Sequence, residues 1–122
     1  MGRKNVVKSY NSFDNVSLAA NQTSPVTDIA FKDNIGIIVD WSGTAPLGEL
    51  IVEATNDDNE VDASNWTWVA LDFGNTITIN GATGNHLINI SQAPFNKIRL
   101  RYARTSGTGN LTATMTIKEI GG

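Results

Sequence analysis

The sequence of 122 residues contains no cysteine and a single histidine, His86. Without cysteine the chain forms neither disulfides nor thiolate-ligated metal sites. One histidine is too few for a histidine-rich zinc site. A Ser-His-Asp arrangement would depend wholly on His86, which has no nucleophile-elbow motif nearby. We therefore expect a protein that is not an enzyme, with no catalytic residue, no metal site and no cofactor.

Long apolar runs are missing as well. No stretch approaches the roughly 18 apolar residues of a membrane span. The N-terminal segment, Met1 to Lys8, is basic but lacks the apolar region of a secretory signal. We expect a protein that is made in the cytoplasm without a signal peptide and has no membrane partner.

Basic residues are absent from the middle of the chain. Residues 34–95 include neither Lys nor Arg, whereas eight acidic residues lie within 40–72. The bases lie mainly toward the two ends, at Arg3, Lys4, Lys8, Lys97, Arg99, Arg101 and Arg104. Since the net charge is −3 and no aromatic row interleaves these bases, nucleic acid is disfavoured as a partner.

Two interpretations of this charge segregation stay open. If the C-terminal bases lie beside the acidic strand predicted at 49–55, Arg99 and Arg101 pair across the sheet with Glu49 and Glu53. If they do not, the subunit has a basic side and an acidic side, which suits contacts with neighbouring subunits.

Helical periodicity is missing throughout, and alternation of apolar and polar residues takes its place. It is clearest in two C-terminal segments, 97–104 and 110–118, separated by Thr105 to Gly109. The Ser, Thr and Gly of this connection favour a tight reversal, so the pattern predicts a β-hairpin with one face in the core. Two strands of this length need the rest of the chain to cover that face.

The preceding residues read as further short strands with turn signals about every ten residues. The most apolar run, 34–41, suits a central strand buried on both sides, and 42–48 would turn it. In the next strand, 49–55, Glu49 and Glu53 are expected to point outward. The pattern predicts an all-β, antiparallel β-sandwich (jelly-roll or Ig-like) of about eight to nine short strands, with an N-terminal arm over 1–10 and a single domain over 11–122.

Two tryptophans, Trp66 and Trp68, lie on the same side of a predicted aromatic strand, 65–73. If Val69, Leu71 and Phe73 face the core, both indoles point outward, where they can stack on sugars or fill a protein interface. A bulge that turns one or both indoles into the core remains open.

The acidic loop at 58–62 has alternating oxygen ligands like those of a calcium loop. However, Ala63 stands where the sharp turn needs glycine, and no carboxylate follows to complete the cage. We expect this loop to be a solvated connection without a metal.

Several turn and strand motifs together resemble those of small virion structural proteins of tailed bacteriophages. They are Thr23 to Thr27, Trp41 to Gly48 with the strand after it, Pro94-Phe95 before Ile98 to Tyr102, and Ser106 to Gly109 with Lys118 to Ile120. The resemblance spans nearly the whole chain. It implies a structural role on a phage particle, as a head decoration protein, a head fibre or a tail-associated subunit, and it brings no catalytic residue.

From this resemblance we expect a virion protein that binds other capsid or tail subunits as a homo-oligomer, for instance a trimer. The alternative is a carbohydrate- or receptor-binding module of a phage fibre, based on the two tryptophans. The candidate residues of the subunit interface are Arg3, Lys4, Lys8, Trp66, Trp68, Arg99 and Arg101.

Overall fold

The structure, a computed structural model, describes residues 5–29, 34–56, 66–72, 76–91 and 96–120, with side chains for all of these except 5–8, 91 and 118–120. Within these residues the chain is all-β and antiparallel, with eight strands and no helix. The predicted fold class is therefore confirmed.

The strands differ greatly in length. They are β1 (Asn5–Ser17), β2 (Gln22–Thr23), β3 (Thr27–Asp28), β4 (Asn34–Thr55), β5 (Val69–Ala70), β6 (Ile77–Asn80), β7 (Thr83–Ser91) and β8 (Lys97–Ile120). With 22 and 24 residues, β4 and β8 are far longer than the short strands that we expected.

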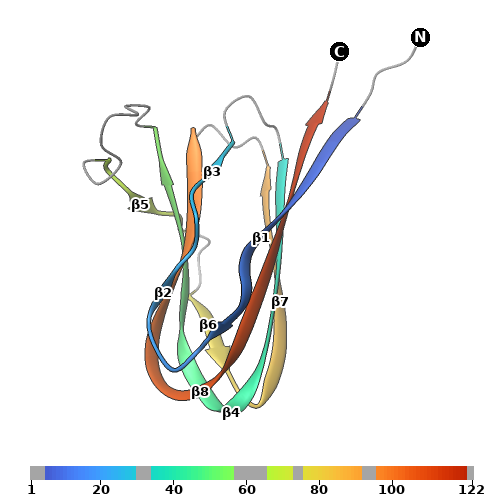
Figure 1. The fold of residues 1–122 in the computed structure, drawn as a ribbon. Helices are drawn as coiled ribbons and strands as arrows, with labels where there is room; N and C mark the ends of the chain where they lie inside the picture. The colour runs from blue at the N-terminus through green and yellow to red at the C-terminus, as the bar shows by residue number, and fades with distance from the viewer. Residues whose placement is uncertain (1–4, 30–33, 57–65, 73–75, 92–95, 121–122) are drawn as a thin grey trace.

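The two long strands pair with each other and bend together, so each contributes to two layers (Figure 1). In layer I, β1 pairs with residues 110–120 of β8. This half of β8 also pairs with residues 34–42 of β4, and these residues of β4 pair on their other side with β7. In layer II, β2 and β3 pair with 97–102 of β8, and 97–106 of β8 pair with 47–55 of β4, which also pair with β5 and β6.

The described strands form two layers, each four strands wide, and β1 lies beside β8, the last described strand. The strand order is β1-β8-β4-β7 in layer I and β2/β3-β8-β4-β6/β5 in layer II. A double antiparallel sheet of this kind, in which the chain passes repeatedly from one layer to the other, is a jelly roll. Of the two sandwich types that the sequence left open, the structure has this one.

The predicted C-terminal hairpin is wrong. Residues 97–104 and 110–118 do not pair with each other but belong to one bent strand, and each pairs with a different half of β4. The glycines of this connection do provide a positive φ. Gly107 has a φ of 80° and lies against Ala45, which itself has a φ of 48°. These two residues form the corner at which both strands pass from one layer to the other, so 42–48 bends β4 without reversing it.

The apolar run at 34–41 is also not buried on both sides. Ile35, Ile37 and Val39 are fully buried, whereas Ile38 between them is 56% exposed. Each layer of a two-layer sandwich covers only one face of the other, so the second face of this strand remains at the surface.

The core lies between the layers and is filled by the inward residues of both sheets. Its members are Phe13, Leu18, Ile29, Ile35, Ile37, Val39, Trp41, Leu50, Val52, Ile77, Ile79, Ile88, Ile90, Ile98, Leu100, Tyr102, Leu111, Ala113, Met115 and Ile117. The alternation that predicted the inward sets of 97–104 and 110–118 is confirmed, although the hairpin joining them is not.

The N-terminal segment joins the sheet before the predicted boundary between arm and domain. The backbone of β1 pairs with β8 from Asn5, opposite Ile120, through Tyr10, opposite Met115. Residues 1–4 lie outside the described part of the chain. The boundary at residue 10 therefore falls within β1, which is an edge strand of layer I.

Candidate functional site: a tryptophan and cation cluster

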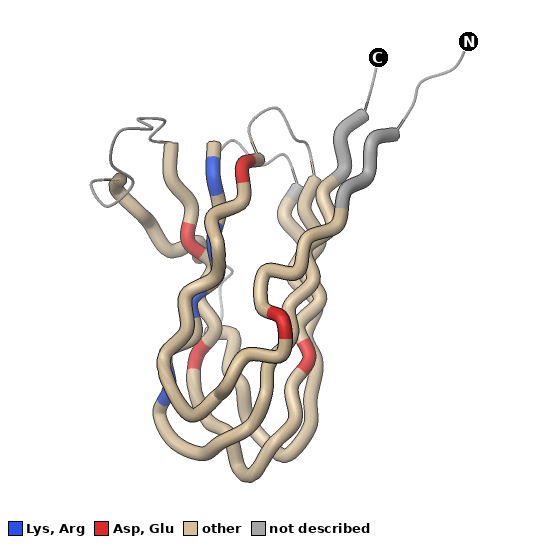
Figure 2. Tube along the Cα trace, in the orientation of Figure 1, with Lys and Arg blue, Asp and Glu red and all other residues tan. Residues whose placement is uncertain are grey.

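The first half of β8 carries a row of bases on the outer face of layer II. Because Ile98, Leu100 and Tyr102 fill the core, the residues between them point the other way. The row consists of Lys97, Arg99 and Arg101, and Figure 2 shows this basic stretch beside the acidic positions of β4.

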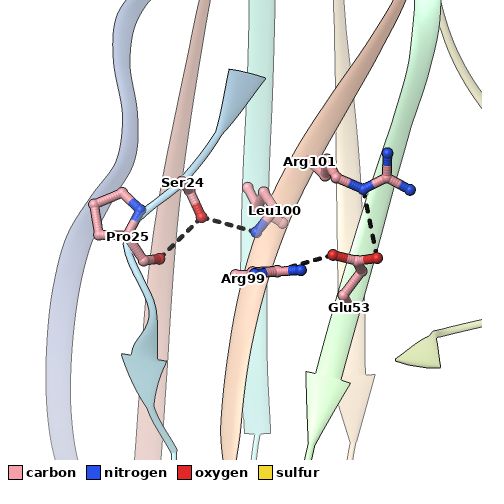
Figure 3. Close-up of polar contacts among 6 residues, drawn as sticks. All are labelled: Ser24, Pro25, Glu53, Arg99, Leu100 and Arg101. Carbon is pink, nitrogen blue, oxygen red and sulfur yellow. Dashed lines mark hydrogen bonds and ion pairs between the residues drawn. The ribbon is translucent and has the colours of Figure 1, made fainter. Parts of the chain in front are cut away.

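Glu53 on β4 lies directly opposite Arg99 in the register. Nε of Arg99 donates a hydrogen bond of 2.9 Å to Oε1 of Glu53, and Nε of Arg101 lies 3.4 Å from Oε2 (Figure 3). The side chain of Glu53 is only 11% exposed. It was expected to point outward, and it does point to the outer face, but the neighbouring side chains bury it there.

The two tryptophans lie over this row of bases. Nζ of Lys97 is 5.3 Å from the centre of the Trp66 ring, and Cζ of Arg99 is 4.2 Å from the centre of the Trp68 ring. The two ring centres are 6.2 Å apart, with a tilt of 51° between the planes. Cations within about 6 Å of an indole face are attracted by its quadrupole. Each indole is half-buried.

On the side of β8 that faces away from β4, hydrogen bonds with Ser24 fix the same part of the strand. Ser24, between β2 and β3, donates its backbone N–H to the carbonyl of Leu100 and accepts the N–H of Leu100 on its hydroxyl, both at 2.8 Å. The hydroxyl in turn donates to the carbonyl of Pro25 at 3.0 Å (Figure 3). The segment that carries Arg99 and Arg101 is therefore fixed from both sides.

The structure thus brings together four of the seven candidate residues. Trp66, Trp68, Arg99 and Arg101 form one cluster, which we call the Trp–cation cluster together with Glu53 and Lys97. Arg3 and Lys4 lie outside the described residues, and Lys8 lies in β1 without a described side chain.

Sequence reasoning missed the burial of Glu53 and the role of Lys97. One of the two open interpretations of the charge segregation paired Arg99 and Arg101 with Glu49 and Glu53. The structure has the pairing with Glu53, whereas Glu49 lies opposite Ala103. Lys97 gave no separate signal, because its position over Trp66 depends on how residues 66–70 fold back onto layer II.

The predicted aromatic strand is shorter than expected. Among its described residues, only Val69 and Ala70 form a strand, β5. Val69 is 60% exposed, so the arrangement in which Val69, Leu71 and Phe73 all face the core is not the one observed. Leu71 does pack against the core, whereas Phe73 lies outside the described residues. With only two residues paired to β4, the segment does not keep strict alternation, so its faces could not be assigned by counting.

The described residues hold no group of three or more His, Cys, Asp or Glu that could bind a metal ion. The acidic loop at 58–62 lies outside them. His86 lies exposed on β7, near Asp40 and Asn85. Within the described part of the chain, no helix is long and apolar enough to cross a membrane.

Comparison with known proteins gives matches in structure but none in sequence. No family model matches the chain, and no curated protein matches it. The fold is similar to that of the SPBc2 prophage-derived protein YomS, with a TM-score of 0.58 and 10% identity, covering 95% of this chain and 96% of that chain.

Two structures of infectious bursal disease virus also share the fold. The Gx strain structure has a TM-score of 0.59 and 12% identity, covering 95% of this chain and 32% of that chain. The VP2 subviral particle has a TM-score of 0.53 and 13% identity, covering 95% and 33%. The chain thus spans about a third of the length of these viral chains. At such identities the likeness establishes the jelly-roll fold.

Proposed function

We propose that this chain is a non-enzymatic structural protein of a bacteriophage particle, made in the host cytoplasm and located in the virion. It binds neighbouring capsid or tail subunits as an oligomeric decoration or fibre-like component. The observation that carries the proposal is the likeness in fold to a prophage-derived protein over nearly the full length of both chains. The same jelly roll forms part of chains in a virus and in a subviral particle.

The Trp–cation cluster supports contact with a protein neighbour. Its two half-buried indoles present apolar surface beside guanidinium groups, and Trp and Arg are the residues most enriched in the energetic centres of protein interfaces. Lys97 lies over the ring of Trp66 and Arg99 over that of Trp68, so these ring faces already contact a cation of the same chain. This arrangement favours the protein-binding role over a sugar-stacking one.

Mass spectrometry of purified particles from the virus that encodes the chain tests the proposal. Hundreds of copies per particle would assign the protein to the capsid, and a few copies to the tail. Absence from infectious particles that contain all other structural proteins would overturn the virion role.

The alternative role, as a carbohydrate- or receptor-binding module, is tested with the purified chain. Binding to host cells or to their surface glycans that is lost in Trp66→Ala and kept in Val69→Ala would favour it. If neither variant nor the wild type binds, the receptor role is excluded.

A further inference from the structure

The two edges of layer I are β1 and β7, and they differ in how they are protected. A sheet edge presents unpaired N–H and C=O groups, and proteins block it with charged residues, proline, bulges or very short edge strands. β1 has two register shifts against β8, a positive φ at Asn15, and the charged residues Lys8 and Asp14. It is a blocked edge.

β7 has none of these features. It pairs with β4 over nine consecutive positions without a register shift, and it contains neither a charged residue nor a proline. The strands at the edges of layer II are short, since β2, β3 and β5 have two residues each and β6 has four. Among the described strands, β7 is therefore the long edge that is open to pairing.

Apolar surface adjoins this edge. Leu87 on β7 is 66% exposed and lies opposite Ile38 on β4, which is 56% exposed. Both belong to the wall of a shallow hollow that also includes Asp40, Asn85 and His86. The neighbouring positions on this outer face, Gly36, Asp40 and Thr114, carry no apolar side chain. The edge thus combines free backbone groups with an apolar centre.

We propose that β7 pairs antiparallel with β7 of a second copy of this chain, about a two-fold axis at Leu87. Layer I of one copy and layer I of the other then form one continuous sheet. Leu87 is the fifth of the nine residues of the strand. Pairing about this residue places Leu87 opposite Leu87, Asn85 opposite Asn89 and Thr83 opposite Ser91. All nine positions then find partners, with the apolar contact in the centre and polar contacts around it.

The composition of β7 favours its own copy as the occupant. A two-fold interface is isologous, so each residue meets a position of the same strand. A strand with charges would place like charges opposite each other or depend on a complementary partner. β7 is uncharged and has matching amides on either side of Leu87, so the pairing with itself is free of repulsion. This proposal does not depend on a virion role.

The mass of the purified chain in solution gives the first test. The wild type is expected at twice the 13.1 kDa of one chain. Leu87→Lys and Leu87→Glu each place like charges across the axis and are expected to give single chains. An equimolar mixture of the two variants places opposite charges there and restores the doubled mass. Val69→Lys, the same kind of change at an exposed residue of β5, is the control that leaves the dimer intact.

Disulfide trapping fixes the axis, because the chain has no cysteine of its own. Directly opposed residues of antiparallel strands have Cα atoms about 4.5–5.5 Å apart, which suits a disulfide. Leu87→Cys is expected to cross-link with itself. Asn85→Cys alone is not, because its two copies lie about 13 Å apart along the strands, but Asn85→Cys mixed with Asn89→Cys is. A wild type that stays a single chain, or cross-linking no faster at Leu87→Cys than at Val69→Cys, overturns the proposal.

Discussion

Glu53 carries a charge in a place where sequence alternation gives no reason to expect burial. The alternation correctly put Val52 and Ala54 in the core and Glu53 on the opposite face. It also allowed the pairing with Arg99 and Arg101, because strands 49–55 and 97–104 could be neighbours. It could not show that Trp66 and Trp68 fold onto the bases, since that depends on where residues 66–70 pair with β4.

We expect Glu53→Gln to lower the free energy of unfolding by about 1–2 kcal/mol, because it leaves Arg99 and Arg101 without their carboxylate. The loss is smaller than for a fully buried pair, since Arg101 is 42% exposed and solvent screens it. Urea denaturation measures the change. Glu49→Gln, on the same strand but exposed, serves as the control and should stay within about 0.5 kcal/mol of the wild type. Equal losses in both variants would contradict the role of Glu53.

Tyr102 predicts a dependence of stability on alkaline pH. Its side chain is fully buried, and its hydroxyl has no hydrogen-bond partner among the described residues. Burial raises the pKa of Tyr102 above its ordinary value near 10, and nearby Arg104 offsets part of this rise. Above pH about 10 the unfolded chain releases this proton while the folded chain keeps it, so stability is complete below that pH and falls as the pH rises.

The Tyr102→Phe variant should lose this alkaline component. Unfolding free energies between pH 8 and 11 would therefore fall less steeply for Tyr102→Phe than for the wild type. At pH 7 the variant should be as stable as the wild type or more so, because the substitution removes an unsatisfied buried hydroxyl. The other tyrosine of the chain, Tyr10, is exposed, and Tyr10→Phe should show the same dependence of unfolding free energy on pH as the wild type. Parallel curves for all three proteins would refute the argument.

Among the elements, the long strands mark the limit of what the sequence could predict. Alternation identified both halves of β8 and the inward residues of each, because that pattern depends only on one covered face. It did not distinguish a reversal at 105–109 from a bend, since Gly107 provides a positive φ in either case. The deciding contact is with Ala45, more than sixty residues earlier in the chain. Local sequence does not encode such a partner.

β1 gives a prediction at the same scale. Deleting residues 2–8 removes the ladder positions from Asn5 to Lys8 opposite Ile117 to Ile120 of β8. We expect the unfolding free energy to fall by about 1–3 kcal/mol, from backbone hydrogen bonds worth about 1 kcal/mol each. Deleting residues 2–4 alone should leave it unchanged. Thermal denaturation of both truncations decides the matter, and an unchanged melting temperature after the longer deletion would show that 5–8 belong to an arm.

For the whole molecule, the charge distribution predicts how attachment to a particle responds to salt. Three bases of β8 already have partners within the domain. Arg99 and Arg101 form ion pairs with Glu53, and Lys97 forms one with Asp28. We therefore expect the N-terminal bases to provide most of the electrostatic attraction to neighbours, which sets mainly the rate of encounter. Such attraction is screened beyond about 8 Å at 0.15 M salt.

Replacing Arg3, Lys4 and Lys8 with Gln should slow attachment to particles and flatten its dependence on ionic strength. Association rates measured between low and high salt test this, with Lys32→Gln as a single-charge control. If attachment of the wild type is itself insensitive to salt, the bases act only within the subunit.

The position of β8 at the centre of both layers has a consequence for synthesis. β1, β2, β3 and both halves of β4 pair with β8, which is the last strand of the described chain. At about 5–20 residues per second, a ribosome needs roughly 6–25 s to make a chain of this length. During that time the earlier strands have no partner from β8, so a nascent chain cannot close its sandwich before β8 has been made.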